Sequence, residues 1–323
     1  MLELKDIQAA AERLKPVVVR TPLIASPVLD ELTGGSVFLK AENLQRVGSF
    51  KIRGAYNFLS QLTPEEAQRG VVAFSSGNHA QAVAAAGTML GIETTIVMPE
   101  DAPQIKIENT RKLGGNTILY DRYTKDRAVI AQEIADERGC TLVPSYDHER
   151  IIAGQGTTGL EIVAQCQEQD VLPDQVLINC SGGGLTAGCA VAIHALSPET
   201  KIHPVEPEEF DDTRRSLLSG NMEVNDPAAR SICDALMVSP PGDITFAINR
   251  ELVSEGLVVS DDEVKEAIRF AFRHLKLVVE PGGAASLAAV LAGQIDLRDK
   301  VTVAILSGGN IDAEMFASIQ KEV

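Results

Sequence analysis

Three short glycine- and serine-rich segments each follow an apolar run and precede a helical pattern. They are Ser75–His79, Ser181–Gly184 and Ser307–Asn310. In open α/β sheets, ligands bind where strands end and helices begin, so these turns are the places where ligand-binding residues are expected. The middle turn holds three consecutive glycines, which allow several backbone N–H groups to point into one concavity at the positive end of a helix. This pattern predicts a phosphate site, and a tightly packed turn is the alternative.

A lysine near the start of another helical pattern is a candidate nucleophile. Lys51 follows Phe50 and precedes Arg53-Gly54-Ala55. Burial beside cations would lower the pKa of its ammonium group, as a Schiff-base nucleophile requires. The alternative is a solvated surface lysine, and this segment alone does not decide between the two.

The segments around these residues alternate apolar runs with helical patterns. Strands are predicted at 71–75, 93–99, 116–120, 175–180, 201–205 and 301–306, and helices at 78–90, 104–113, 125–138, 156–167, 185–196, 261–275 and 283–292. Continuous Val, Ile and Leu runs between helices indicate an α/β fold whose parallel sheet is covered on both faces. A chain of 323 residues exceeds the usual size of one hydrophobic core, so two domains are expected.

Composition excludes several classes of partner. A net charge of −16, no tryptophan and 4% aromatic residues are unfavourable for binding nucleic acid, and no stretch is long and apolar enough to span a membrane. The five cysteines are scattered without C-x-x-C spacing, so they predict reduced thiols in a cytoplasmic protein. A small anion can still bind, because backbone N–H groups and a few local cations can overcome a distant negative field.

Six motifs occur in one order along the chain. They are Ser49–Ala55, Ser75–Ala80, Gly154–Thr157, Ser181–Gly184, Glu280–Ala284 and Leu306–Asn310. This order resembles the fold-type-II, tryptophan-synthase-β-like pyridoxal-phosphate enzymes, in the branch of the serine/threonine dehydratases and serine racemases. The resemblance extends from Thr21 to Asp312.

The resemblance implies a two-domain fold with pyridoxal 5′-phosphate between the domains. The large domain is expected to hold residues 1–48 plus 147–323, and a small mobile domain of residues 49–146 is inserted in it. The implied activity is a dehydratase, or ammonia-lyase, that removes water and ammonia from serine, threonine or 3-hydroxyaspartate to give a 2-oxo acid. A homodimer is also implied.

Site roles follow from the resemblance, position by position. Lys51 is expected to bind the cofactor and to take the α-proton of the substrate. The other implied cofactor contacts are Phe50 against the ring, Asn78 at the 3′-oxygen, Gly182, Gly183, Gly184 and Leu185 at the phosphate, and Ser307 at the pyridine nitrogen. The loop implied to receive the substrate carboxylate contains Ser75, Ser76, Gly77, Asn78 and His79. A hydroxyl partner such as Ser307 gives no strong reason to protonate the pyridine nitrogen, which favours elimination over a long-lived carbanion.

Two residues depart from the common dehydratase pattern. Ser76 stands where dehydratases usually have alanine, and it matches the opposite-face proton donor of serine racemases. Serine or aspartate racemisation by Lys51 and Ser76 is therefore the alternative function, and a structural loop serine is the simpler interpretation. Arg230 could pair with a second carboxylate and so indicate 3-hydroxyaspartate, or it could be a surface arginine.

Carboxylates are dense between Glu206 and Asp212. Hard cations prefer oxygen ligands, and the resemblance implies a divalent ion held by Glu206, the carbonyl of Phe210 and Asp212. Mg²⁺ is the expected ion, with Ca²⁺ or Mn²⁺ as alternatives. An acidic helix N-terminus capped by Asp211 or Asp212 is the competing interpretation.

Overall fold

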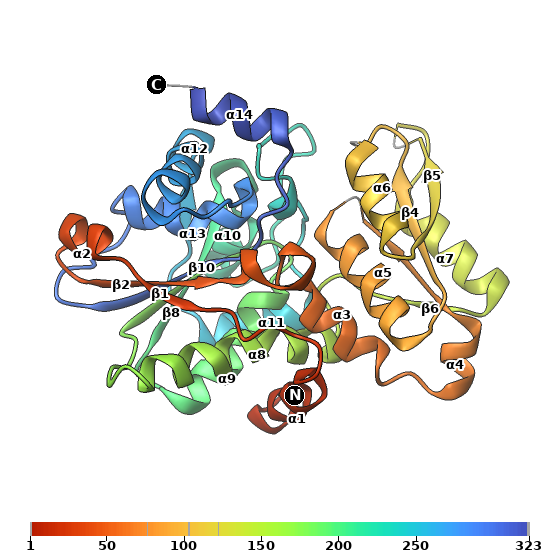
Figure 1. Ribbon diagram of the computed structural model, residues 1–323, viewed down its shortest axis with the longest axis horizontal. Coiled ribbons are helices and arrows are strands. Elements are labelled where there is room, and N and C mark those ends of the chain that lie inside the picture. Colours follow the sequence, from red (N-terminus) through yellow and green to blue (C-terminus); the bar gives the residue numbers. More distant parts are fainter. Residues whose placement is uncertain (1, 76, 103, 122, 322–323) are drawn as a thin grey trace.

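The chain folds into two lobes, each built on its own β-sheet (Figure 1). The computed structural model describes residues 2–75, 77–102, 104–121 and 123–321. The larger sheet contains, in spatial order, β1 (Leu23–Ala25), β2 (Ser36–Ala41), β10 (Val301–Leu306), β7 (Gln175–Asn179), β8 (Lys201–Pro207) and β9 (Leu257–Val259). All neighbouring strands are parallel except β1, which is antiparallel to β2.

Helices cover both faces of the larger sheet. One face packs against α12 (Asp261–Phe270) and α13 (Pro281–Leu291), and the other against α8 (Glu149–Gln167) and α9 (Gly184–Leu196). Leu177 of β7 lies in the first core and its neighbours Val176 and Ile178 lie in the second. The continuous apolar runs of the sequence arise because both faces of these strands are buried.

The smaller lobe holds a fully parallel sheet. Its strands are, in spatial order, β5 (Asn116–Tyr120), β4 (Thr94–Pro99), β3 (Val71–Phe74) and β6 (Thr141–Leu142). The cores on its two faces are formed mainly with α5 (Asn78–Leu90) and with α7 (Arg127–Arg138). These strands fall within the predicted insertion, residues 49–146, whose boundaries stay a prediction.

The remaining helices complete the two lobes. They are α1 (Leu4–Leu14), α2 (Pro27–Thr33), α3 (Lys51–Leu59), α4 (Pro64–Arg69), α6 (Gln104–Lys112), α10 (Asp212–Ser219), α11 (Asp243–Leu252) and α14 (Ala313–Lys321). None of the helices in the described ranges has the length and apolar character that crossing a membrane requires.

Two helices differ from their predicted bounds by more than two residues. The helix expected from Gly156 begins at Glu149, where the ring nitrogen of His148 accepts a hydrogen bond from the N–H of Arg150. Glycines within its first turns hid this start from the periodicity, because they serve close packing against neighbouring helices. The helix expected to end at Leu275 is α-helical only to Phe270 and continues as a π-helical turn.

Candidate active site

A cavity of about 720 Å³ lies between the two lobes. All three glycine- and serine-rich turns contribute to its wall, together with Phe50 and Lys51. Each turn follows the carboxyl end of a parallel strand, namely β3, β7 or β10. The topology therefore brings together segments separated by more than two hundred residues in sequence.

Lys51 is the first residue of α3, and its side chain is half-buried in this cavity. Its Nζ donates a hydrogen bond to the carbonyl of Ser145 at 2.9 Å and lies 5.2 Å from the ring centroid of Phe50. Burial lowers the pKa of the amine to about 8, and the nearby Glu280 carboxylate opposes this shift. A sizeable neutral fraction near physiological pH suits a nucleophile and a base.

The glycine turn between β7 and α9 lies so close to Tyr146 that side chains at Gly182 and Gly184 would have no room. A Cβ at Gly182 would lie 2.5 Å from Cδ2 of Tyr146, and one at Gly184 would lie 3.0 Å from the Tyr146 carbonyl. Gly183, the N-cap of α9, has φ of +89°, which disfavours a side chain. The turn thus presents bare backbone at a helix N-terminus.

The same turn has the donors that an anion needs. The first N–H groups of a helix lack intrahelical partners. Thr186 Oγ1, in the first turn of α9, is buried and has no partner in the described structure, and Thr186 lines the cavity. Because pyridoxal phosphate carries a dianionic tail, the turn and this hydroxyl fit its phosphate.

Asn78 is held by side chains on both sides. Its Nδ2 donates to Glu280 Oε1, and its Oδ1 accepts from Asn310 Nδ2 at 2.7 Å. Asn310 also donates to the carbonyl of Val47. The first residue of α5 is thereby fixed to the large lobe, in the wall of the same cavity.

Ser307 is oriented by the larger sheet. Its Oγ accepts a hydrogen bond of 2.9 Å from Asn179 Nδ2, so its own hydrogen remains free to donate. Asn179 in turn accepts from the N–H and the hydroxyl of Ser286. A free donor here would suit an unprotonated ring nitrogen, the partner that the resemblance implies for Ser307.

The β3–α5 turn also lines the cavity. Ser75 Oγ accepts from the N–H of Gly77 at 3.2 Å. His79 is buried, and its Nε2 lies 3.2 Å from the carbonyl of Val143. Burial, and then the charge of Lys51, lower the pKa of His79 to about 3, so the ring stays neutral and donates through Nε2. Ser76, the predicted opposite-face base, lies outside the described residues.

Arg230 does not belong to the cavity wall. Its side chain is exposed and its Nη1 donates to the carbonyls of Pro227 and Ala229. Arg230, the expected partner of a second substrate carboxylate, therefore does not lie with the other predicted site residues in this structure. Its guanidinium is hydrogen-bonded to its own surface loop instead.

The acidic segment forms a buried pair of carboxyl groups. Glu206 accepts hydrogen bonds from the backbone N–H groups of Thr213 and Arg214, so it caps α10. Asp212 Oδ2 is buried without a partner in the described structure. Burial, and for Glu206 also the charge of Asp212, raise the pKa of both groups, to about 6 for Asp212. Across the described ranges, no three His, Cys, Asp or Glu side chains gather as a metal site.

The cavity also contains cations that the sequence did not single out. Lys106, in the first turn of α6, pairs with Asp234 at 2.7 Å. Arg127, the first residue of α7, lies 5.6 Å from the ring centroid of Phe74. It forms no ion pair with a carboxylate in the part of the chain that the structure describes. Their position just after β4 and β5 was the available signal, because carboxyl ends of parallel strands share one edge.

Comparisons with known proteins agree with this geometry. The family model "Pyridoxal-phosphate dependent enzyme" matches residues 14–308. The chain is 44% identical over 317 residues to an L-threo-3-hydroxyaspartate ammonia-lyase of Pseudomonas sp, covering 98% of each, and 40% identical to a serine racemase of Schizosaccharomyces pombe, covering 97% of this chain and 95% of the relative. The structure of maize serine racemase superposes with a TM-score of 0.92 at 36% identity, covering 98% of this chain and 96% of that one.

The predicted resemblance and the predicted fold class are both confirmed by these matches. Taken with the half-buried lysine and the bare glycine turn, they give one conclusion. The chain belongs to the family of pyridoxal-phosphate dependent enzymes.

Proposed function

We propose that this enzyme is an ammonia-lyase for small β-hydroxy-α-amino acids. The reaction removes the β-hydroxyl as water and the amino group as ammonia, and one water is consumed again, so the net products are a 2-oxo acid and ammonium. The observation that carries the proposal is the amine of Lys51, which lies in one cavity with the bare glycine turn. Ammonia-lyases among the similar proteins support the same reaction class.

The residues of the cavity suit the cofactor. Gly182, Gly183 and Gly184 would hold its phosphate, Asn78 its 3′-oxygen and Ser307 its ring nitrogen. When bound, pyridoxal phosphate withdraws electrons from the α-carbon of an attached amino acid and so acidifies its α-hydrogen.

The chain's own groups then perform the remaining tasks. Lys51, whose pKa is lowered to about 8, takes the α-proton. The β3–α5 turn receives the substrate carboxylate through backbone N–H groups and the Ser75 hydroxyl. His79, being neutral and buried, orients this turn and donates to Val143.

The preferred substrate within this class is 3-hydroxyaspartate. Arg127 supports this choice, because it is an exposed guanidinium on the wall of the cavity with no carboxylate partner in the described ranges. A guanidinium without a carboxylate partner can bind a second substrate carboxylate through two parallel hydrogen bonds.

An assay of 2-oxo acid release over L-serine, L-threonine and the isomers of 3-hydroxyaspartate tests both statements. Arg127→Ala is expected to raise KM for 3-hydroxyaspartate by about tenfold or more, the value of a lost charge-assisted hydrogen bond, and to change KM for L-serine by less than about threefold. Arg230→Ala is the matched control and should change neither. Equal effects of Arg127→Ala on KM for both substrates would contradict the role of Arg127 in selecting 3-hydroxyaspartate. If no substrate gives a 2-oxo acid, the proposed ammonia-lyase activity is contradicted.

Racemisation is the second candidate function. The serine racemase of Schizosaccharomyces pombe and the presence of Ser76 support it. Ser76→Ala is expected to abolish exchange of the α-hydrogen with inversion while sparing elimination. Equal loss of both activities would make Ser76 a general substrate-binding residue.

A divalent ion at Glu206, Asp212 and the Phe210 carbonyl is also proposed. The unpartnered Asp212 Oδ2 and the two buried acidic groups support Mg²⁺, since a bound cation would favour their charged forms. Addition of Mg²⁺ should raise the melting temperature of the wild-type protein and leave that of Asp212→Asn unchanged. A homodimer and a cytoplasmic location remain predictions, which light scattering and cell fractionation test.

A further inference from the structure

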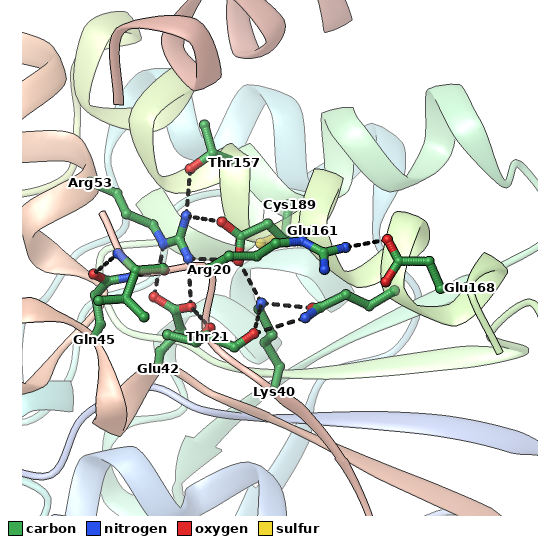
Figure 2. A network of polar contacts seen from close by, with 12 residues as sticks. Arg20, Thr21, Lys40, Glu42, Gln45, Arg53, Thr157, Glu161, Glu168 and Cys189 are labelled. Atoms are coloured by element: carbon green, nitrogen blue, oxygen red, sulfur yellow. Dashed lines mark hydrogen bonds and ion pairs between the residues drawn. The ribbon is translucent and has the colours of Figure 1, made fainter. Parts of the chain in front are cut away.

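A buried cluster of charges joins α3, the helix that carries Lys51, to α8 and to the segment of Lys40 and Glu42 (Figure 2). Its charged members are Lys40, Glu42, Arg53 and Glu161. The side chains of the first three are completely buried, and that of Glu161 is 15% exposed. Two positive and two negative charges leave the cluster neutral. None of these residues lines the active-site cavity.

Arg53 uses every hydrogen-bond donor that its side chain has. Nε and Nη2 donate to the two oxygens of Glu42, both at 2.8 Å. Nη1 and Nη2 donate to the two oxygens of Glu161 at 2.8 and 2.9 Å, and Nη1 also donates to Thr157 Oγ1 at 3.1 Å. Two forked pairs in one plane fix the guanidinium in position and in orientation.

Lys40 completes the cluster in the same way. Its three N–H donors reach the Thr21 carbonyl at 2.8 Å, Glu161 Oε2 at 2.6 Å and Gln165 Oε1 at 2.8 Å. The Lys40 amine is therefore satisfied without any contact to Arg53. Lys40 belongs to β2, and Glu161 and Gln165 belong to α8.

Arg53 and Lys51 lie on opposite sides of one helical turn. Successive residues in an α-helix are rotated by about 100°, so positions 51 and 53 differ by about 200°. Arg53 thus holds the back of the turn whose front presents Lys51. A second contact joins α3 to α8 here, since the N–H of Gly54 donates to Gln155 Oε1 at 3.1 Å. The two helices also approach closely, because a Cβ at Gly154 would lie 2.7 Å from the Cα of Gly54.

Stability alone is a poor explanation for such a cluster. Moving these four charges out of water costs about as much free energy as their attraction returns, and apolar replacements of buried ion pairs are often neutral or stabilising. What the cluster provides is a fixed geometry between α3, α8 and the strand β2. Residue 51 falls in the predicted mobile insertion, yet its helix begins bound to the large lobe.

We propose that Arg53 is a positioning residue, whose forked contacts to Glu42 and Glu161 fix the first turn of α3 to the large lobe and so hold Lys51 toward the glycine turn. This role rests on the proposed function of Lys51. It assigns to Arg53 no contact with cofactor or substrate.

Two charge-balanced double variants separate positioning from the loss of a buried ion pair. Glu42→Gln with Arg53→Met removes one charge of each sign and both forked contacts of Arg53. Lys40→Met with Glu161→Gln removes one charge of each sign as well, but it keeps the forked contact between Arg53 and Glu42 and leaves an amide oxygen at position 161. The proposal predicts that kcat falls by at least about tenfold in the first double variant, with a smaller change in KM, and by less than about threefold in the second.

The pH profile of Lys51 gives a readout independent of catalysis. In the apoprotein, the rate of labelling of Lys51 by an amine reagent is measured against pH by peptide mass spectrometry. Loss of the forked contact should shift the midpoint upward by about one unit toward that of a solvated lysine, because the amine then leaves its buried position. The control double variant should keep the wild-type midpoint.

Equal losses of kcat in both double variants, or an unshifted midpoint in the first, would overturn the proposal. Arg53→Lys serves if the first double variant does not fold. This substitution keeps the charge but not the fork, and it should give the same upward shift; a wild-type midpoint contradicts the proposal. If the midpoint shifts in the first double variant but the wild-type enzyme releases no 2-oxo acid, the positioning role of Arg53 is supported and the proposed ammonia-lyase activity is contradicted.

Discussion

Glu280 is the acidic residue whose charge raises the pKa of the Lys51 amine, against the effect of burial. It is buried, accepts a hydrogen bond from Asn78 and adjoins the first residue of α13. Burial, and then the charge of Asp234, raise the pKa of Glu280 to about 7, while Lys106 and Lys51 act in the opposite direction. The protonation of this carboxyl group and of Lys51 therefore changes within one narrow range around neutral pH.

The raised pKa of Glu280 predicts a pH dependence of stability. The folded apoprotein keeps the Glu280 proton up to about pH 7, whereas the unfolded chain loses it near pH 4.5. The native state binds more protons in this window, so this residue's contribution declines as pH rises through it, by up to about 3 kcal/mol. Glu280→Gln should remove this decline.

Urea unfolding of both proteins at pH 5 and at pH 8 measures the effect. The difference in unfolding free energy between the two pH values should shrink in Glu280→Gln. Glu251→Gln, at an exposed position of α11, is the control and should behave as wild type. An unchanged pH dependence in Glu280→Gln would show that this carboxyl group ionises normally.

At the scale of elements, the turn before α9 leaves little room for side chains. Gly183 has φ of +89°, and a Cβ there would lie 2.8 Å from Asn249 Nδ2 and 3.0 Å from Thr245. Gly183→Ala is expected to displace the turn and to weaken cofactor binding by at least about tenfold, in addition to a backbone cost of about 1–2 kcal/mol.

Gly220→Ala supplies a matched control. Gly220 has φ of +75°, at the end of α10, and a Cβ there would meet nothing within 4 Å. Both variants should lose similar stability from backbone strain, but only Gly183→Ala should need more pyridoxal phosphate to reach half-saturation in a fluorescence titration. Equal cofactor affinities would mean that the turn does not shape the phosphate site.

Much of this architecture could be predicted from sequence, for identifiable reasons. The strands are continuous apolar runs, and the turns that follow β3, β7 and β10 are marked by glycine and serine. The start of α8 was missed because its interior glycines look like a loop. The cluster around Arg53 was invisible, since its partners come from positions 21, 40, 42, 157, 161 and 165, which only tertiary packing brings together.

Arg230 shows the same limit from the other side. Its residue type suited a second carboxylate, but a loop holds its guanidinium at the surface. Arg127 occupies the cavity instead, at the start of a helix whose sequence offered no motif. The residue type predicts which chemical group a side chain can bind, but it does not predict whether that side chain lies in the cavity.

At the scale of the whole molecule, the ion pair between Lys106 and Asp234 joins the two lobes at the cavity. Lys106 belongs to α6 of the small lobe, and Asp234 belongs to the large lobe. Their side chains are 18% and 54% exposed, so the pair contributes about 0.2–1 kcal/mol and is weakened by salt. Its energy is small compared with folding but is sufficient to bias how the lobes approach.

Exchanging the two charges tests this link. Lys106→Glu and Asp234→Lys are each expected to raise KM for L-serine by about threefold to fivefold, and the double variant should recover most of the loss. Asp262→Asn, a charge change at an exposed pair on α12, should have no effect. Additive losses in the double variant would show that the pair does not couple the lobes.

The account depends most directly on which side chain holds the cofactor. Borohydride reduction of the holoenzyme fixes the cofactor on that amine, and peptide mass spectrometry then identifies the residue. The predicted result is a single pyridoxyl adduct on Lys51, which is absent from Lys51→Ala. An adduct on Lys106 or Lys125, the other lysines of the cavity, or no adduct at all, would contradict the account.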